Sequence, residues 1–221
     1  KILGNIDNKE IVNFHYLNKE KENYLCTLNS DGQFKKVLFD EDMIKSNRVF
    51  SIAKLKNNIK IIDSFITNEE KSLIILTSIG RLFKYDLSNK FLNISSKQSQ
   101  GILLVKLLPT EKIASCCKCN PDQSVTLVSL KGKFFKLKID KIYDSKDSKL
   151  GYLDERFHLK NDQFIKIFSD NQYLDIETNK NKSARFNSDT INSGSRNNID
   201  FLKLEKDEYL ENCFSLDNFL N

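Results

Sequence analysis

The sequence has 221 residues, of which 39% are hydrophobic and 29% are charged, and 35 Lys and Arg residues against 30 Asp and Glu residues give a formal charge of +5. This composition is typical of a globular protein and excludes a chain that is disordered throughout. The longest apolar runs, such as Leu73–Leu76 and Ile102–Val105, are far shorter than the roughly 20 residues that cross a bilayer as a helix. The excess of basic residues suits a polyanionic partner.

A short string recurs along the chain and predicts a series of β-hairpins. Each copy is an apolar stretch, a tight turn and then a basic and aromatic stretch. The copies are Leu25–Lys36, Ile74–Lys84, Thr126–Lys136 and Ile165–Asp175, with turn residues Gly32, Gly80, Gly132 and Asn171. These turn residues lie 48, 52 and 39 residues apart. Gly and Asn tolerate the left-handed backbone of tight turns, so we expect one hairpin in each copy.

Two further strings recur with the same period of about fifty residues. One opens a strand at Glu10, Lys60, Lys112 and Glu208, and the other is Ile52–Leu55, Leu104–Leu107 and Phe201–Leu204. Each unit therefore supplies about four strands. That number is typical of a propeller blade, which cannot bury both its faces alone and must stack on its neighbours. In the irregular fourth unit we expect Tyr152–Leu159 to be the first strand and Asn179–Asn198 to be a disordered loop.

The repeat resembles that of the C-terminal domain of the gyrase A subunit. The stretch from Leu73 to Lys84, continued through Gln100-Gly101-Ile102 to Leu107, is the most similar, and Val125–Leu137 is nearly as similar. The resemblance implies an all-β fold, a β-propeller-like β-pinwheel of about four four-stranded blades. The blades would be units of roughly residues 10–59, 60–111, 112–150 and 151–221 in one domain of residues 1–221.

The resemblance also implies a function. Domains of this family hold and bend duplex DNA, and this chain would then be the C-terminal part of a longer A subunit of a type II DNA topoisomerase. Its expected partners are duplex DNA, the ATPase subunit of the parent enzyme and the breakage-reunion core of its A subunit. No cofactor, small-molecule substrate or membrane partner is expected for this domain, and its location would be cytoplasmic, or organellar if a transit peptide has been removed.

One family feature is absent from the sequence. The gyrase box, Gln-Arg-Arg-Gly-Gly-Lys-Gly, has only distant counterparts in Lys97–Gly101 and Ser193–Arg196. The absence of this box argues against strong DNA wrapping and negative supercoiling, and favours a resemblance to the topoisomerase IV A subunit or to a diverged paralogue that does not wrap DNA. A protein-interaction propeller, in which the charge of +5 is incidental, is a further alternative.

Cations that recur by blade are the candidate DNA contacts. A spaced column of cations is sufficient for non-specific affinity, which arises mostly from counterion release, although lysines on strand ends also serve solubility. Lys36, Lys84 and Lys136 lie four places after their turns, and Arg81 and Lys133 follow theirs directly. The full candidate set is Lys35, Lys36, Arg48, Arg81, Lys84, Lys97, Lys131, Lys133, Lys136, Lys138, Arg185 and Arg196, while Lys54, Lys106 and Lys203 repeat without a clear role.

Catalysis and metal binding have little support in the sequence. The only two histidines, His15 and His158, are not near a nucleophile, so this domain is not expected to be an enzyme. Cys116, Cys117 and Cys119 lack a second Cys-x-x-Cys pair, so we expect no zinc site. Aligning the repeats places Cys117 and Cys213 at the position of Phe65, which predicts that these cysteines are structural.

Overall fold

The computed structural model of the chain describes residues 12–13, 15, 23–39, 51–53, 55–67, 71–145, 150–192, 196–198 and 203–215. The strands are β1 (Asn23–Asn29), β2 (Gln33–Phe39), β3 (Ile61–Thr67), β4 (Ser72–Thr77), β5 (Leu82–Asp86), β6 (Ile102–Leu103), β7 (Ile113–Cys119), β8 (Ser124–Ser129), β9 (Lys133–Lys138), β10 (Phe164–Ser169), β11 (Tyr173–Thr178), β12 (Ser183–Asn187), β13 (Arg196–Asn198) and β14 (Leu210–Ser215). Three single-turn 3-10 helices are η1 (Ile139–Lys141), η2 (Glu155–Phe157) and η3 (Ser188–Thr190). The described part of the chain has no α-helix, and the predicted all-β class is confirmed.

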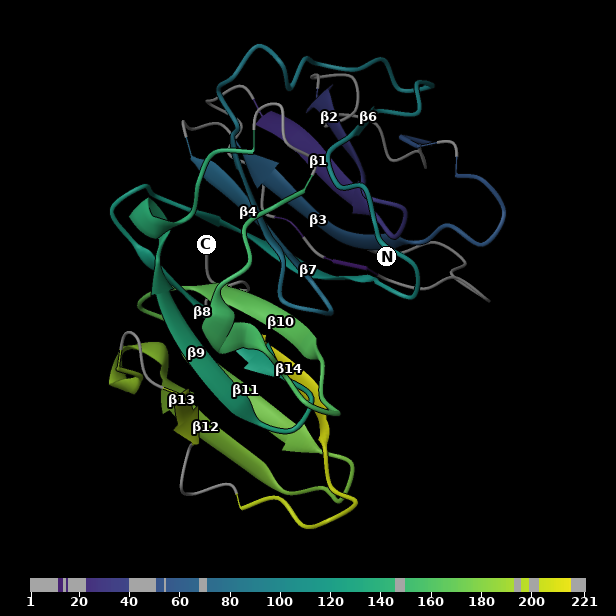
Figure 1. The fold of residues 1–221 in the computed structure, drawn as a ribbon. Helices are drawn as coiled ribbons and strands as arrows, with labels where there is room; N and C mark the ends of the chain where they lie inside the picture. Colours follow the sequence, from purple (N-terminus) through teal and green to yellow (C-terminus); the bar gives the residue numbers. More distant parts are fainter. Residues whose placement is uncertain are drawn as a thin grey trace.

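The strands form four small antiparallel sheets, in the orders β3-β1-β2-β6, β5-β4-β7, β10-β8-β9-β13 and β12-β11-β14. Figure 1 shows these sheets following one another in chain order, from purple at the top to yellow at the bottom. Each sheet contains a hairpin (β1–β2, β4–β5, β8–β9 or β11–β12), and a later strand (β3, β7, β10 or β14, respectively) pairs with the first strand of that hairpin. This arrangement is the expected pinwheel of about four blades.

In the first and third sheets, the strand at one edge comes from a later part of the chain, after the hairpin of the next sheet. β6 pairs with β2 across the intervening strands β3 to β5, and β13 pairs with β9 in the same way. In the second sheet, β5 is bridged by Asp144 and Tyr152 instead. The sheets are therefore interleaved along the chain, and the sequential units predicted from the repeats, such as residues 10–59, do not coincide with individual sheets.

The fourth hairpin lies later in the chain than the sequence pattern indicates. β10 pairs with β8, whereas β11 pairs with β12 and β14, so Asn171 lies in a connection between two sheets. The hairpin turn is at Asn181, which has a φ of 58°, nearly the same as the 59° of Asn171. The predicted disordered loop at Asn179–Asn198 is also wrong in part, because it contains β12 and η3. Tyr152–Leu159 contributes one bridge and η2 rather than a strand.

The core consists of three apolar layers, each packed between two consecutive sheets. All six residues of β4 are buried, and they alternate between layers: Leu73 and Ile75 belong to the layer shared with the first sheet, and Ile74 and Leu76 to the layer shared with the third. The entirely buried strand β8 shows the same pattern. A continuous apolar strand is stable here because a sheet covers each of its faces.

Connecting segments hold neighbouring hairpin turns together. The N–H groups of Leu104 and Val105 donate to the Gly32 carbonyl at 3.0 and 3.2 Å, and the next carbonyl, of Lys106, accepts a hydrogen bond from Arg81. This segment therefore joins the first hairpin turn to the second.

A second link joins the next pair of turns. The ring of Phe164 lies against Gly80, and the Asp162 carboxylate accepts a hydrogen bond from the Lys131 backbone N–H at 3.0 Å. The first three hairpin turns thus lie next to one another.

Candidate nucleic-acid interface

Four cations occupy the same register position in the four sheets. In the second strand of each hairpin, Lys36 lies opposite Cys26, Lys84 opposite Ile74, Lys136 opposite Thr126 and Arg185 opposite Asp175. We call Lys36, Lys84, Lys136 and Arg185 the cation column. The sequence places Arg185 in the expected disordered loop at Asn179–Asn198, and the structure instead makes it the fourth member of this repeating set.

Lys36 is held by neutral groups. Its Nζ donates to the Leu87 carbonyl at 3.0 Å and lies 4.6 Å from the centroid of the Tyr24 ring. An aromatic ring attracts a cation without cancelling its charge. The contacts that these two groups make with Lys36 Nζ therefore add no negative formal charge beside it.

Lys84 and Lys136 are instead paired with aspartates. Lys84 Nζ lies 3.2 Å from Asp144, and Lys136 Nζ lies 3.0 Å from Asp170 and 3.3 Å from Asp189. The two lysine side chains are only 17% and 10% exposed, whereas Asp144 and Asp189 are 53% and 45% exposed. Burial disfavours the charged form of Lys136, but the two carboxylates outweigh it and raise the pKa of this ammonium.

Arg185 forms a two-point ion pair with Asp175 on the neighbouring strand β11. The distances are 2.6 Å from Nε and 2.8 Å from Nη2 to the two carboxylate oxygens. Hydrogen bonds from Arg185 lower the pKa of Asp175, so this carboxylate is ionised at neutral pH. The guanidinium is 59% exposed and is the most accessible cation with a carboxylate partner in the column.

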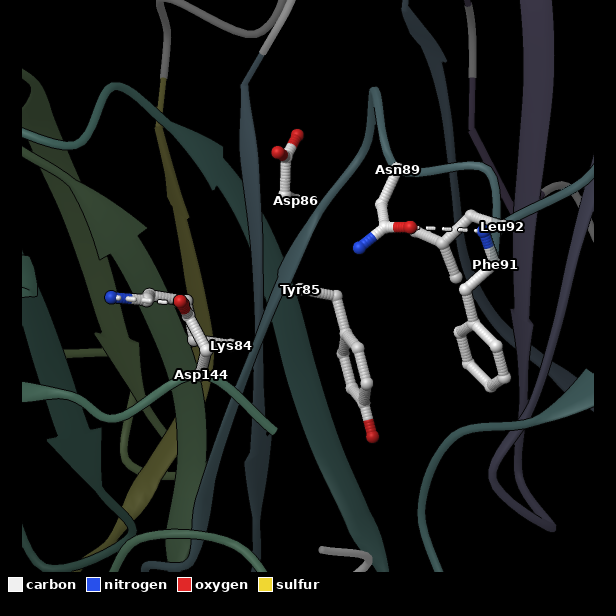
Figure 2. Close-up of a pocket in the computed structure, with 7 residues that line it drawn as sticks. All are labelled: Lys84, Tyr85, Asp86, Asn89, Phe91, Leu92 and Asp144. Atoms are coloured by element: carbon white, nitrogen blue, oxygen red, sulfur yellow. Dashed lines mark hydrogen bonds and ion pairs between the residues drawn. The ribbon is translucent and has the colours of Figure 1, made fainter. Parts of the chain in front are cut away.

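The Lys84–Asp144 pair borders a pocket. Figure 2 shows this pair on one side of the pocket and the ring of Phe91 on the other, with Tyr85 between them. The lining residues are Lys84, Tyr85, Asp86, Asn89, Phe91, Leu92 and Asp144. Two carboxylates and one ammonium give this pocket little attraction for an anion.

The structure corrects the assignment of Arg81 to the DNA-contacting set. Its side chain is buried, with Nε donating to Glu111 at 2.8 Å, Nη1 to the Leu150 carbonyl at 2.7 Å and Nη2 to the Lys106 carbonyl at 2.8 Å and to the second Glu111 oxygen. Burial disfavours the Glu111 carboxylate, but hydrogen bonds led by those from Arg81 lower its pKa. Arg81 therefore joins a hairpin turn to two connecting segments and does not face a ligand.

Lys35 is buried as well, and it is corrected for the same reason. Its side chain packs in the first sheet with Nζ donating to the carbonyls of Lys97 and Ser99 at 2.7 and 2.8 Å. Burial lowers its pKa. This lysine fixes the connecting segment of residues 97–99 onto β2 and is not available to a phosphate.

The remaining candidate DNA contacts differ in how far their side chains are exposed to solvent. Lys131 and Lys138 are exposed, and Lys133 lies 3.9 Å from Asp162 with its side chain 32% exposed. Lys97 is half-buried. Arg48 and Lys54 lie outside the described residues, and only the backbone of Arg196 is described, in β13. Of the lysines without an assigned role, Lys106 and Lys203 are exposed.

Sequence reasoning missed the acidic partners of the residues that follow the turns. In the fourth sheet Glu208 repeats the role of Glu111: it accepts from Thr178 at 2.8 Å, from Lys182 at 2.9 Å and from the Glu205 backbone N–H at 2.9 Å. The Glu205 N–H, followed by Lys182, lowers its pKa to about 2. A sequence pattern could have identified both acids, because Glu111 and Glu208 each lie two residues before the first residue of a strand, β7 and β14 respectively.

The cysteines are reduced and mostly buried, and burial raises the pKa of the Cys26 and Cys213 thiols to about 12. Cys117 lies opposite the same position of its hairpin as Phe65, but Cys213 is shifted by one residue because Phe214 takes that position. Within the described ranges, no group of three or more His, Cys, Asp or Glu side chains is placed to hold a metal ion. None of the helices described there is long and apolar enough to cross a membrane.

Three solved structures share this architecture. The C-terminal domain of DNA topoisomerase IV matches with a TM-score of 0.74 and 19% identity, over 90% of this chain and 64% of that one. The DNA gyrase A C-terminal domain matches with a TM-score of 0.70 and 15% identity, over 88% and 66%. The E. coli ParC C-terminal domain matches with a TM-score of 0.58 and 14% identity, over 89% and 80%. These likenesses show the fold.

A curated relative extends the likeness to the sequence. In an alignment 162 positions long that covers 69% of this chain, the sequence is 25% identical to the A subunit of DNA topoisomerase 4 from Synechocystis sp.. The chain spans 18% of the length of that relative. No model of a known protein family matches the sequence. The chain is a β-pinwheel that resembles the C-terminal domains of the topoisomerase IV and gyrase A subunits.

Proposed function

We propose that this chain binds duplex DNA without sequence preference and bends it, as a C-terminal domain of a type II topoisomerase A subunit. The observation that carries the proposal is the cation column, because one cation stands at the same position of every sheet. Consecutive sheets would then present cations at regular intervals to a phosphate backbone. Non-specific affinity requires such spaced cations and no base-reading element.

The breakage and reunion of DNA would belong to other parts of the parent protein, in the cytoplasm. Within this chain the proposed contacts are the cation column together with Lys131, Lys133 and Lys138 of the third hairpin, while Lys97, Arg48 and Arg196 remain candidates in the connecting segments. Arg81 and Lys35 are left out because their donors are used inside the protein. The proposed protein partners of the parent are the breakage-reunion core and the ATPase subunit.

A protein-interaction propeller is the competing function, and salt dependence separates the two. The logarithm of the DNA-binding constant should fall linearly with the logarithm of salt concentration, with a slope of about −0.9 per neutralised phosphate. We expect a slope between about −3, if only Lys36, Lys131 and Lys138 neutralise phosphates, and about −5, if six cations do. Fluorescence anisotropy with two unrelated short duplexes measures this slope. A slope near zero, or a strong preference for one duplex, would contradict the proposal.

A further inference from the structure

Three of the four cations in the column, Lys84, Lys136 and Arg185, are paired with aspartates. Lys84 is paired with Asp144, which follows η1 at the end of the next hairpin, and Arg185 is paired with Asp175 of β11. Two of these four side chains are more than half exposed, Asp144 at 53% and Arg185 at 59%. Each pair therefore has one member that reaches solvent.

We propose that these aspartates occupy the places of DNA phosphates in the unbound domain and so set its affinity for DNA. This inference rests on the proposed function. A phosphate that meets a cation–carboxylate pair meets a net charge of zero, and it gains the cation only by displacing the carboxylate. Exposed ion pairs contribute little to stability, so this exchange is possible, but it removes most of the electrostatic gain of the contact.

Lys136 is also paired with aspartate, but with two carboxylates, those of Asp170 and Asp189. Asp189 is 45% exposed and lies 3.3 Å from Lys136 Nζ, while Asp170 also accepts a hydrogen bond from the Ser124 backbone N–H at 2.8 Å. Asp189 also accepts from the Asn171 backbone N–H, but at the longer distance of 3.4 Å, so it is the more readily exchanged partner, whereas Asp170 holds the backbone of β8.

Lys36 supplies an internal comparison within the same column. Its acceptors are the Leu87 carbonyl and the Tyr24 ring, neither of which carries a formal charge. Lys36 should thus contribute more to DNA affinity than Lys84 in the unmodified protein, and the contribution of Lys84 should rise once Asp144 has lost its charge.

The test is the isosteric double variant Asp144→Asn with Asp175→Asn. Freeing two cations should steepen the salt slope by about 2, since each newly neutralised phosphate adds about 0.9, and should tighten binding roughly tenfold or more at about 0.1 M salt. The matched control is Asp122→Asn with Asp207→Asn, two exposed aspartates outside the column whose replacement changes the net charge equally. The control should leave the slope nearly unchanged.

A double-mutant cycle assigns the gain to the named pair. Lys84→Ala should weaken binding roughly tenfold in the Asp144→Asn background, and several-fold less than that in the unmodified protein. Far-ultraviolet circular dichroism and thermal melts establish that each variant is folded, and the single Asp144→Asn and Asp175→Asn variants provide the same comparison if the double variant does not fold.

The outcomes separate this inference from the function on which it rests. An unmodified protein that does not bind DNA at low salt would overturn the proposed function. An unmodified protein that binds DNA, with equal salt slopes in the column variant and the control variant, would overturn only the role of the aspartates. Equal losses for Lys84→Ala in both backgrounds would overturn it as well.

Discussion

Replacing Arg81 by Met should lower the free energy of unfolding by about 3–5 kcal/mol, because the Glu111 carboxylate would remain buried without its cation. The side chains of Arg81 and Glu111 are only 7% and 1% exposed, so water cannot replace the lost partner. The same change also removes the hydrogen bonds to the carbonyls of Leu150 and Lys106, which tie two connecting segments to the second hairpin turn. The measurement is urea unfolding followed by circular dichroism.

Arg185→Met is the matched control for this prediction, since it removes a two-point ion pair of similar geometry whose arginine side chain is 59% exposed and whose carboxylate is 16% exposed. Water screens an exposed pair and solvates the remaining carboxylate, so this variant should leave the urea midpoint nearly unchanged. Glu111→Met combined with Arg81→Met should recover part of the loss, because no unpaired charge is then buried. Equal losses for Arg81→Met and Arg185→Met would show that the buried pair does not hold the segments together.

Gly32→Ala should destabilise the protein by about 3 kcal/mol or more, through two separate effects. Gly32 has a φ of +82°, where an alanine is strained, and an added Cβ would lie 2.2 Å from the Val105 carbonyl oxygen. That oxygen belongs to the backbone of the segment that joins the first two hairpin turns, so it can move only if the segment separates from the turn. Thermal unfolding monitored by circular dichroism measures the loss.

Gly132→Ala separates the two effects. Gly132 has a comparable φ of +70°, but the nearest atom to an added Cβ is the end of the flexible Leu204 side chain at 3.1 Å. Only the backbone strain remains, so the loss should be roughly 1–2 kcal/mol. If Gly32→Ala proved no worse than Gly132→Ala, the close packing of the segment around Val105 would not be important for stability.

Local sequence signals predicted three of the four hairpins. Gly32, Gly80 and Gly132 all have positive φ in turns, as the period of about fifty residues indicated. The fourth turn was misplaced because Asn171 and Asn181 satisfy the same backbone requirement. Spacing could have decided between them, since Asn181 lies 49 residues after Gly132, close to the earlier intervals of 48 and 52.

The interleaving of the sheets could not be predicted in the same way. β6 has only two residues, and it pairs with Gln33 and Phe34 some seventy positions earlier in the chain. So short a strand has no periodicity of its own, and its position depends on packing against the preceding sheet.

In the candidate site, too, features set by residues near in sequence could be predicted, whereas features set by residues distant in sequence could not. The cation column could be predicted because register follows from distance to the turn residue, and Arg185 fits the rule once Asn181 is taken as that residue. The burial of Arg81 and Lys35 could not be predicted, because their acceptors lie 25 to 69 residues away along the chain. A basic residue after a turn can therefore be a surface contact in one sheet and a structural link in another.

The topology of plasmid DNA tests the central claim, that this pinwheel bends duplex DNA along its cation column, most directly. Relaxed closed-circular plasmid is incubated with increasing amounts of the 221-residue chain, treated with a nicking-closing enzyme, and freed of protein before electrophoresis. Bending a site of about 20 to 30 base pairs costs on the order of 1–6 kcal/mol, which contacts on several sheets must offset. We predict a shift in linking number that grows with protein and is lost in the triple variant Lys36→Ala, Lys84→Ala, Lys136→Ala, which should still bind short duplexes. An unchanged topoisomer distribution at concentrations that saturate short duplexes would contradict the claim.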